Sequence, residues 1–232
     1  MRTPCYCPSC QSPVLDGAKA NTKAFDFTCP DCAQYFQLKS KSSPIGNRIL
    51  DAALETMLCA IAEDRTPNLF ALHYDRASWL VKDLFLIPHF AFSASAIEAR
   101  KPLGPKARRA GWVGYIIVLD HIPPDARIPI VRDGIVVDPC RVRDSFSRLR
   151  ELQQIPVKER GWLVDVLRVV RSLRKNEFTN NDVYQFEAEL RGLHPINRHV
   201  RDKIRQQLQF LRDRNFLTQL ERGVWALKHQ TP

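Results

Sequence analysis

Two Cys-x-x-Cys pairs near the amino terminus constrain this chain more than any other feature of its sequence. Cys7 and Cys10 form the first pair, Cys29 and Cys32 form the second, and eighteen residues separate the two pairs. A proline in each pair favours a tight turn that presents two thiolates to one ion, and the spacing is typical of a four-cysteine zinc ribbon. We therefore expect a structural zinc site. Redox-active cysteines are disfavoured, because no thiol-oxidoreductase pattern surrounds the pairs.

Net charge narrows the possible partners. The 232 residues contain 35 Lys and Arg against 25 Asp and Glu, which gives a net charge of +10. This excess favours a polyanionic partner, either a nucleic acid or an anionic membrane surface. No apolar run approaches the roughly 18 residues that span a bilayer, and the amino terminus lacks the apolar core of a signal peptide. We expect a cytoplasmic protein without a membrane-spanning segment or disulfides.

The chain is expected to form two domains of different kinds. Residues 1–155 mix runs rich in β-branched residues with helical patterns, which indicates an α+β fold. Polar residues, a proline and a glycine cluster between two helical patterns at 153–161, so the second domain is expected to cover 156–232. In the first domain, apolar spacing predicts a helix over about 48–64. The other elements expected there are strands near 33–40, 68–74, 79–88, 112–123 and 127–137, and helices near 95–100 and 142–154.

The second domain reads as a winged helix-turn-helix. An amphipathic helix over 161–174 comes first, Thr179 is the expected cap of a second helix, a third covers 197–216, and a hairpin pattern follows. In the third helix, apolar residues at helical spacing pack inward and leave a basic, polar surface for the DNA major groove. The alternative is a merely solvated face, but seven Lys and Arg against two Asp over 191–214 exceed what solubility needs. The inward residues are Val200, Ile204, Leu208 and Leu211, and the exposed ones are Arg198, Arg201, Arg205, Gln206 and Gln209.

Three polar residues around the second cysteine pair suggest hydrolytic chemistry. Asp26 precedes the pair, and Gln37 and Lys39 follow it in a strand-like run. Nucleases use an aspartate and an acid-x-lysine on adjacent strands to hold Mg²⁺ against the scissile phosphate, and the lysine stabilises the developing charge. A zinc ion between the strands would fix their register without a catalytic role. From spacing alone, a polar strand edge beside a zinc ribbon explains these residues equally well.

Four segments together resemble a known family. "YCPSC", "DFTCPDCAQYFQLKSK", "RKPLGPKARRAGWVG" and "KIRQQLQFLRDRNF" resemble, in this order, the DpnI-like methyl-directed restriction endonucleases. The resemblance implies a PD-(D/E)xK nuclease domain with a mixed sheet and an inserted zinc ribbon, followed by a winged helix. It also implies a type II restriction enzyme that cuts both strands of GATC when the adenine carries an N6-methyl group. Both domains would contact the methylated site, and the enzyme would act as a monomer.

The same resemblance assigns roles to individual residues. Asp26 would be the first ligand of a catalytic Mg²⁺, Gln37 would take the place of the second motif acid, and Lys39 would be the motif lysine, with the Leu38 backbone also holding the metal. Gln37 departs from the family, because an amide brings an oxygen but no charge. Glu55, with Asp51 one turn away on the expected helix, is the candidate for a displaced acid, and the alternative is an ordinary exposed acid.

A basic loop completes the candidate DNA contacts. Residues 100–109 hold five Lys and Arg without an acid, and prolines and a glycine keep them in a loop. Lys106, Arg108 and Arg109 suit phosphate contacts. Trp112 follows, and the resemblance implies that it packs against the methyl groups of the modified adenines, whereas a tryptophan after a loop is otherwise more often part of a core.

Three functions therefore compete. The first is a Mg²⁺-dependent endonuclease specific for N6-methyladenine in GATC. The second is a methyl-DNA binding protein whose cleavage is disabled by Gln37. The third is a transcription regulator built from a zinc ribbon and a winged helix, with no nuclease ancestry.

Overall fold

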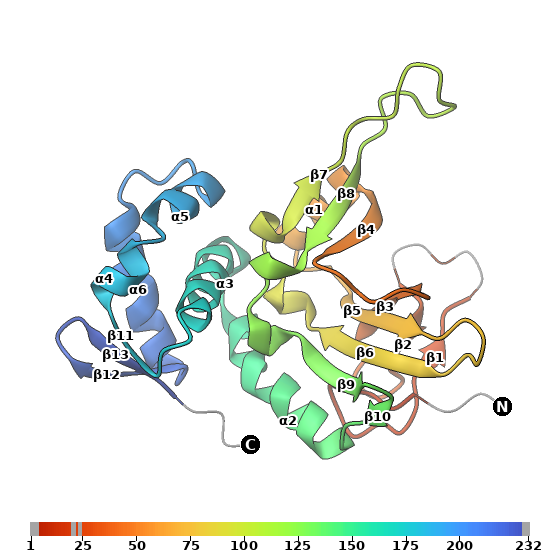
Figure 1. Cartoon of the computed structure of the whole chain (residues 1–232), viewed down its shortest axis with the longest axis horizontal. Coiled ribbons are helices and arrows are strands. Elements are labelled where there is room, and N and C mark those ends of the chain that lie inside the picture. Colours follow the sequence, from red (N-terminus) through yellow and green to blue (C-terminus); the bar gives the residue numbers. More distant parts are fainter. Residues whose placement is uncertain (1–4, 20–21, 23–24, 229–232) are drawn as a thin grey trace.

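The computed structural model describes residues 5–19, 22 and 25–228 (Figure 1). A seven-stranded mixed sheet dominates the amino-terminal part, with strand order β1-β2-β3-β5-β6-β9-β10. Only β3 and β5 pair in parallel; every other pair in this sheet is antiparallel. The strands are β1 (Asp16–Gly17), β2 (Phe27–Thr28), β3 (Tyr35–Lys41), β5 (Asn68–Tyr74), β6 (Val81–Ile87), β9 (Ile128–Arg132) and β10 (Ile135–Val136). The expected α+β class with a mixed sheet is confirmed.

The crossover between β3 and β5 contributes one strand, β4, to a second sheet. This sheet has three antiparallel strands in the order β4-β8-β7, with β4 at Arg48–Ala53, β8 at Gly114–Val118 and β7 at Ile97–Ala99. The helix predicted over 48–64 is therefore wrong in its first six residues, and helix α1 covers Leu54–Ala62. Ile49 and Asp51 are buried while Leu50 is 59% exposed, which is the period-2 alternation of a strand. Pairing with β8 overrides the helical spacing of the apolar residues.

Helices complete the amino-terminal part. Helix α2 (Pro139–Leu149) packs beside β9 and is followed by the 3-10 turn η5 (Arg150–Gln154). The helix expected near 95–100 is instead a 3-10 turn, η2 (Ala94–Ala96), that leads into β7. Three more 3-10 turns are η1 (His89–Ala91), η3 (Leu119–His121) and η4 (Pro124–Ala126).

The carboxy-terminal part is a winged helix-turn-helix, as expected. Helix α6 buries all four residues of the predicted inward stripe, and the strands form a sheet in the order β11-β13-β12. Thr179 caps α4 through a capping box with Asp182. The second predicted helix is divided into α4 and α5 at Gln185–Phe186. The elements are α3 (Val157–Ser172), β11 (Glu177–Thr179), α4 (Asn180–Tyr184), α5 (Glu187–Leu193), α6 (Val200–Asp213), β12 (Leu217–Glu221) and β13 (Val224–Leu227).

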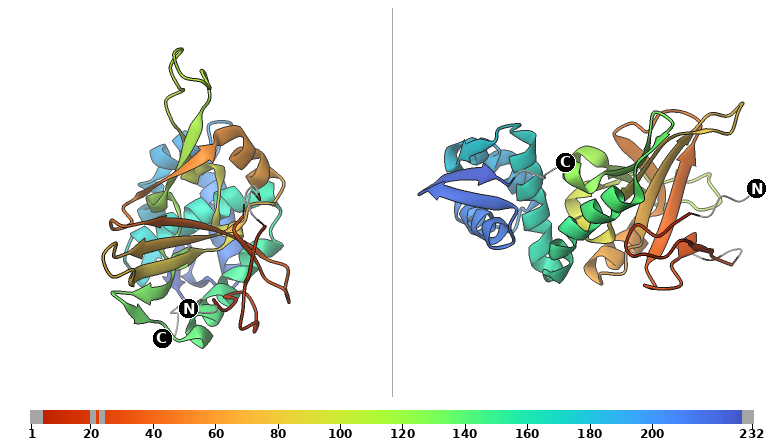
Figure 2. Two further views of the ribbon diagram at one scale, coloured as in Figure 1. Left: turned by 90° about the vertical axis from the view of Figure 1, so that its right-hand side faces the viewer. Right: turned by 90° about the horizontal axis from the view of Figure 1, so that it is seen from below.

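Helix α3 lies between the two parts of the molecule (Figure 2). It contacts α1 and η2 on one side and α6 on the other. Every residue from Trp162 to Val170 is buried, including Asp165 and Arg168. The helix predicted over 161–174 is present, but it lacks the exposed face of an amphipathic helix from Trp162 to Val170, because both flanks of α3 are covered. None of the described helices is long and apolar enough to cross a membrane.

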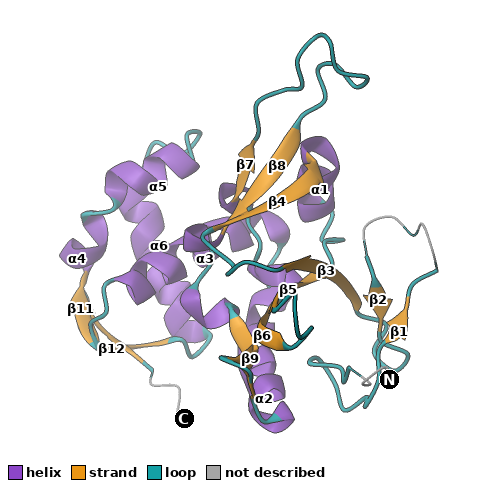
Figure 3. Ribbon diagram, turned by 45° about the vertical axis from the view of Figure 1, so that its right-hand side comes forward, coloured by secondary structure: helices purple, strands orange, loops and turns teal. Residues whose placement is uncertain are grey.

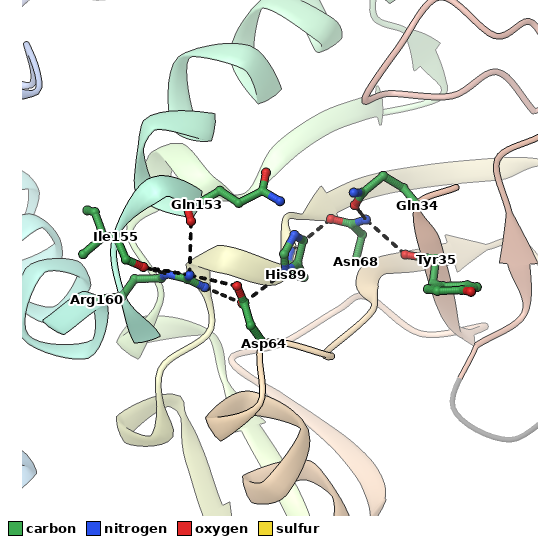
Figure 4. A network of polar contacts seen from close by, with 8 residues as sticks. All are labelled: Gln34, Tyr35, Asp64, Asn68, His89, Gln153, Ile155 and Arg160. Atoms are coloured by element: carbon green, nitrogen blue, oxygen red, sulfur yellow. Dashed lines mark hydrogen bonds and ion pairs between the residues drawn. The ribbon is translucent and has the colours of Figure 1, made fainter. Parts of the chain in front are cut away.

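A polar network joins α3 to the start of β3 (Figure 4). Arg160 of α3 is 4% exposed and donates to both carboxylate oxygens of Asp64, at 2.6 and 3.0 Å. The Arg160 guanidinium holds the pKa of Asp64 below its ordinary value. Asn68 at the head of β5 accepts from the backbone amide of His89 and donates to the carbonyl oxygen of Tyr35, both at 3.0 Å. The winged-helix part is thereby tied to the sheet beside β3.

We expect Arg160→Met to lower the free energy of unfolding by about 2–3 kcal/mol, because it removes charged hydrogen bonds from a buried site. The matched control is Arg65→Met, since Arg65 pairs with Glu63 at the surface and exposed pairs contribute about 1 kcal/mol or less. Urea unfolding of both variants measures the difference. Equal losses in both variants would contradict a structural role for the network.

The pairing of Asp64 with Arg160 also depends on pH. Because the pKa of Asp64 is lowered in the folded protein, the pair stabilises the fold fully at pH values above the ordinary pKa of a carboxyl group, and this stabilisation is lost as the pH falls through the lowered pKa.

Candidate active site and nucleic-acid surfaces

The four predicted cysteines converge on one point. Their sulfur atoms all lie within 4.8 Å of one another, and the Cys7–Cys32 and Cys10–Cys29 sulfur pairs are 3.7 and 3.5 Å apart. A tetrahedral site with Zn–S bonds of about 2.3 Å has S–S edges of about 3.8 Å, so the cluster fits a zinc ion, whereas a disulfide requires about 2 Å. Cys5 is exposed and outside this cluster. The site could therefore bind a metal ion such as zinc.

Two arginines attach the first cysteine turn to the body of the protein. Arg143 of α2 donates from Nε to the carbonyl oxygens of Cys7 and Cys10, at 3.1 and 2.6 Å. Arg150 of η5 donates to the carbonyl oxygen of Ser9 at 2.6 Å. These contacts span more than 130 residues of sequence, so no local pattern predicts them. The cysteine cluster is an anchored part of the fold.

Hydrogen bonds within the second cysteine turn favour a thiolate at Cys29. Burial alone would raise the pKa of the Cys29 thiol, but hydrogen bonds from the backbone amides of Cys32 and Asp31 lower it to about 7. Metal ligation requires the deprotonated sulfur. Burial raises the pKa of the Cys32 thiol in the same turn, so within this turn the thiolate is favoured at Cys29.

Asp26 lies against the edge of β3. Its carboxylate Oδ2 accepts a 2.6 Å hydrogen bond from the backbone amide of Leu38. Its own backbone amide donates to the carbonyl oxygen of Phe36 at 2.8 Å. The side chain is exposed to solvent. Asp26 comes three residues before Cys29, and β3 begins three residues after Cys32. The second cysteine pair therefore lies in the turn between β2 and β3, two neighbouring strands (Figure 3), and Asp26 directly precedes β2.

Gln37 and Lys39 project from the same face of β3. Side chains two residues apart in a strand point the same way, and Phe36 on the other face is fully buried against Phe70, with ring centroids 5.0 Å apart. The half-buried Gln37 and Lys39 thus flank the Leu38 amide that holds Asp26. The structure gathers the three predicted catalytic residues on one short segment.

Reasoning from sequence placed Asp51 on a helix beside Glu55, whereas the structure places it on strand β4 beside Lys39. Its carboxylate oxygen Oδ1 lies 2.5 Å from the Lys39 ammonium, and the Asp51 side chain is only 2% exposed. Tyr115 of β8 donates to its Oδ2 at 2.9 Å, and the amide of Ala52 donates to Oδ1 at 2.7 Å. The alternation of apolar and polar residues in "RILDAA" was the available signal, because it fits a strand with Ile49 and Asp51 on one face.

Burial and the nearby carboxylate both act on Tyr115. Burial raises the pKa of the Tyr115 phenol well above its ordinary value, and the adjacent Asp51 raises it further. The phenol is therefore a permanent proton donor to Asp51. By contrast, Glu55 lies in the first turn of α1 and is exposed.

The basic loop between β7 and β8 protrudes from the body of the protein (Figure 1). Lys106, Arg108 and Arg109 are exposed on it, as expected. Within the described part of the chain, none of these three cations lies at ion-pair distance from a carboxylate. The loop therefore offers unneutralised positive charge.

Trp112 lies at the base of this loop. It is half-buried, with the Arg109 guanidinium 4.8 Å from its ring centroid. Gly114 is required beside it, since a Cβ there would come within 3.0 Å of the Trp112 ring and 3.1 Å of the Ala52 carbonyl oxygen. The indole Nε1 is buried and has no hydrogen-bond partner in the described structure. Trp112 thus presents an unsatisfied donor next to the basic loop.

The third helix of the winged part presents its predicted polar residues at the surface. Arg201, Arg205 and Gln206 of α6 are exposed, and so is Arg198, which the structure places two residues before the helix begins. Arg201 donates to Glu187 at 2.6 Å and lies over the Tyr184 ring, while Arg205 pairs with Asp202. These pairs hold part of the cationic surface in intramolecular contacts.

Comparison with known families matches almost the whole chain. Residues 1–155 match the model of the DpnI, or Dam-replacing, family, and residues 158–226 match the model of the Dam-replacing helix-turn-helix domain. The DpnI family is a nuclease family, which supports a DNA hydrolase. The winged helix-turn-helix supports DNA as the partner. The first match covers the part with the mixed sheet, and the second covers the winged helix-turn-helix that follows it. This chain therefore belongs to the DpnI (Dam-replacing) family.

Proposed function

We propose that this protein is a methyl-directed type II restriction endonuclease that cuts double-stranded DNA at GATC sites containing N6-methyladenine. The observation that supports it best is the convergence of Asp26, Gln37 and Lys39 on one segment of β3, in a chain of a nuclease family. The proposal includes Mg²⁺ as catalytic ion, zinc as structural ion, and a monomer acting on DNA in the cytoplasm of a prokaryote.

The chemistry follows from the groups at β3. Hydrolysis adds a water oxygen to phosphorus and breaks one P–O ester bond, and negative charge builds up on the phosphate oxygens. When bound, Mg²⁺ offsets part of that charge. The Asp26 carboxylate, the Gln37 amide oxygen and the Leu38 backbone carbonyl would hold the ion, since Mg²⁺ prefers oxygen ligands. The Lys39 ammonium supplies a second positive charge that is fixed in place before the reaction.

DNA recognition uses two surfaces. The basic loop positions the duplex through phosphates, and the Trp112 indole offers an apolar face to the methyl groups of the modified adenines. The position of the Trp112 ring at the base of the basic loop, with the Arg109 guanidinium 4.8 Å from its centroid, supports this role. Arg198, Arg201, Arg205 and Gln206 of the third helix would read base edges and phosphates in the major groove.

The test of the function is cleavage of GATC-containing plasmid from methylating and non-methylating hosts, with Mg²⁺ present. Cutting of the methylated plasmid alone is the expected result. Equal cutting of both plasmids would reject methyl-directed specificity. If the protein cuts neither plasmid and binds both equally, the transcription regulator is the hypothesis that remains.

A cleavage-deficient N6-methyladenine binding protein is the second candidate, favoured by the neutral Gln37. Loss of one preorganised electrostatic contact typically lowers a rate by about 10²–10³. Tight binding of the methylated duplex in a gel-shift assay, with no cutting after prolonged incubation with Mg²⁺, is the result that would favour it.

For the basic loop, we expect the double variant Lys106→Gln/Arg108→Gln to weaken binding of methylated and unmethylated duplexes alike. Each lost phosphate contact lowers the slope of log affinity against log salt by about 0.9, so a decrease of about 2 is expected. Arg76→Gln/Lys82→Gln is the control, because it removes the same charge from two exposed residues of the β5–β6 hairpin, Arg76 in the turn and Lys82 in β6. An unchanged slope in the loop variant would exclude phosphate contacts there.

A further inference from the structure

The acid missing at position 37 has a structural replacement on a different strand. We propose that Asp51 of β4 is the second carboxylate of the metal site, so that Asp26 and Asp51 together hold the divalent cation. This inference rests on the proposed function and deepens it. It assigns to Asp51 the role that the resemblance implied for Gln37 and that the sequence suggested for Glu55.

Position is the first support. Gln37 and Lys39 share a face of β3, and the carboxylate of Asp51 lies 2.5 Å from the ammonium of Lys39. Asp51 therefore reaches the same face of β3 from the second sheet. Asp26 accepts a hydrogen bond from the amide of Leu38, between these two residues. Two carboxylates thus contact the segment from Gln37 to Lys39.

Preorganisation is the second support. The Asp51 carboxylate is fixed by the Tyr115 hydroxyl, by the Ala52 amide and by Lys39. Neighbours that orient a ligating carboxylate in this way set metal affinity. Glu55 has no such support, because it is exposed at the start of α1.

Charge is the third support. A neutral Gln37 leaves Asp26 as the only carboxylate among the three motif positions, while Asp51 restores a second negative charge. A purely structural ion pair between Lys39 and Asp51 is the competing explanation. Burying such a pair is often no better for stability than an apolar replacement, so stability alone does not account for its placement beside Gln37.

Binding of Mn²⁺ to the free protein, measured by electron paramagnetic resonance, tests the inference without cleavage, because Mn²⁺ shares the oxygen preference of Mg²⁺. We expect Asp51→Asn to weaken Mn²⁺ binding by at least about tenfold. Glu55→Gln is the matched control and should bind as the unmodified protein does. Unchanged affinity in Asp51→Asn, or weakened affinity in Glu55→Gln instead, would overturn the assignment.

Restoring the motif acid is a sharper test. We expect Gln37→Glu to recover Mn²⁺ affinity when it is added to Asp51→Asn, because it returns the missing charge to the site. If Gln37→Glu does not recover the affinity, then Asp51→Asn weakens Mn²⁺ binding by changing the structure of the site and not by removing a ligand charge. That result would overturn the inference.

A further comparison serves if Asp51→Asn alone misfolds. Lys39→Met is then compared with Lys39→Met/Asp51→Asn, which contains no unpaired buried charge. The loss of Mn²⁺ affinity should appear in the double variant, and equal affinities in the two would overturn the inference.

The inference and the proposed function fail separately. If the unmodified protein cuts methylated plasmid while Asp51→Asn binds Mn²⁺ normally, the function stands and the role of Asp51 does not. If Mn²⁺ binding requires Asp51 but no plasmid is cut, the role of Asp51 stands and cleavage does not.

Discussion

Lys39→Met lowers the rate of cleavage of methylated plasmid by about 10²–10³, the typical effect of removing one preorganised charge. Methionine keeps the apolar length of the side chain and removes only the ammonium. The ammonium is held 2.5 Å from Asp51 and is 28% exposed, so it is both fixed and accessible to a phosphate. Single-turnover cleavage measures the rate, and a gel shift with methylated duplex checks that binding is retained.

Lys41→Met is the control for this prediction. Lys41 is two residues further along the same strand and is exposed. Its replacement removes the same charge from the same face of β3 and should leave the rate nearly unchanged. If Lys39→Met cuts at the unmodified rate, then β3 is not part of the active site.

Asp51→Asn added to Lys39→Met should recover any lost thermal stability, because it removes the uncompensated buried carboxylate.

Local patterns predicted the parts of the fold that depend on few residues. The four cysteines converge as their spacing predicts, and the apolar stripe of α6 is fully buried. Thr179 caps α4 as predicted. The determining features are the spacing of the cysteines, the periodicity of one helix and a capping box, and each is a property of a short sequence.

The features that sequence reasoning missed depend on contacts between distant residues. β4 forms because it pairs with β8, which lies more than 60 residues further along the chain, and helical spacing in a short apolar run does not exclude a strand. Helix α3 is buried all round because two separate parts cover it. The role suggested for Glu55 assumed a helix that continued back to residue 48. Once β4 replaces that first part, Asp51 is directed to Lys39.

Loss of the metal from the cysteine cluster should have an effect as large as loss of Lys39. Cys29 and Cys32 of the cluster lie in the turn that leads from Asp26 to β3, and a misplacement of about 1 Å can lower a rate by about 100-fold. We therefore expect Cys10→Ser, and the unmodified protein after strong chelation, to lose cleavage of methylated plasmid. Metal analysis of the unmodified protein should find one zinc per chain.

Hydrogen exchange separates this local effect from general unfolding. The amides around the cysteine turns and at the β2–β3 edge should lose protection in Cys10→Ser, while those of α6 in the winged-helix part should keep it, because structural zinc stabilises the segment that its ligands enclose. Cys59→Ser and Cys140→Ser are the controls, since both thiols are exposed and outside the cluster. If Cys10→Ser loses zinc yet cuts at the unmodified rate, then the arginine contacts to the first turn suffice to hold Asp26 beside Leu38, and the metal does not set the geometry of the site.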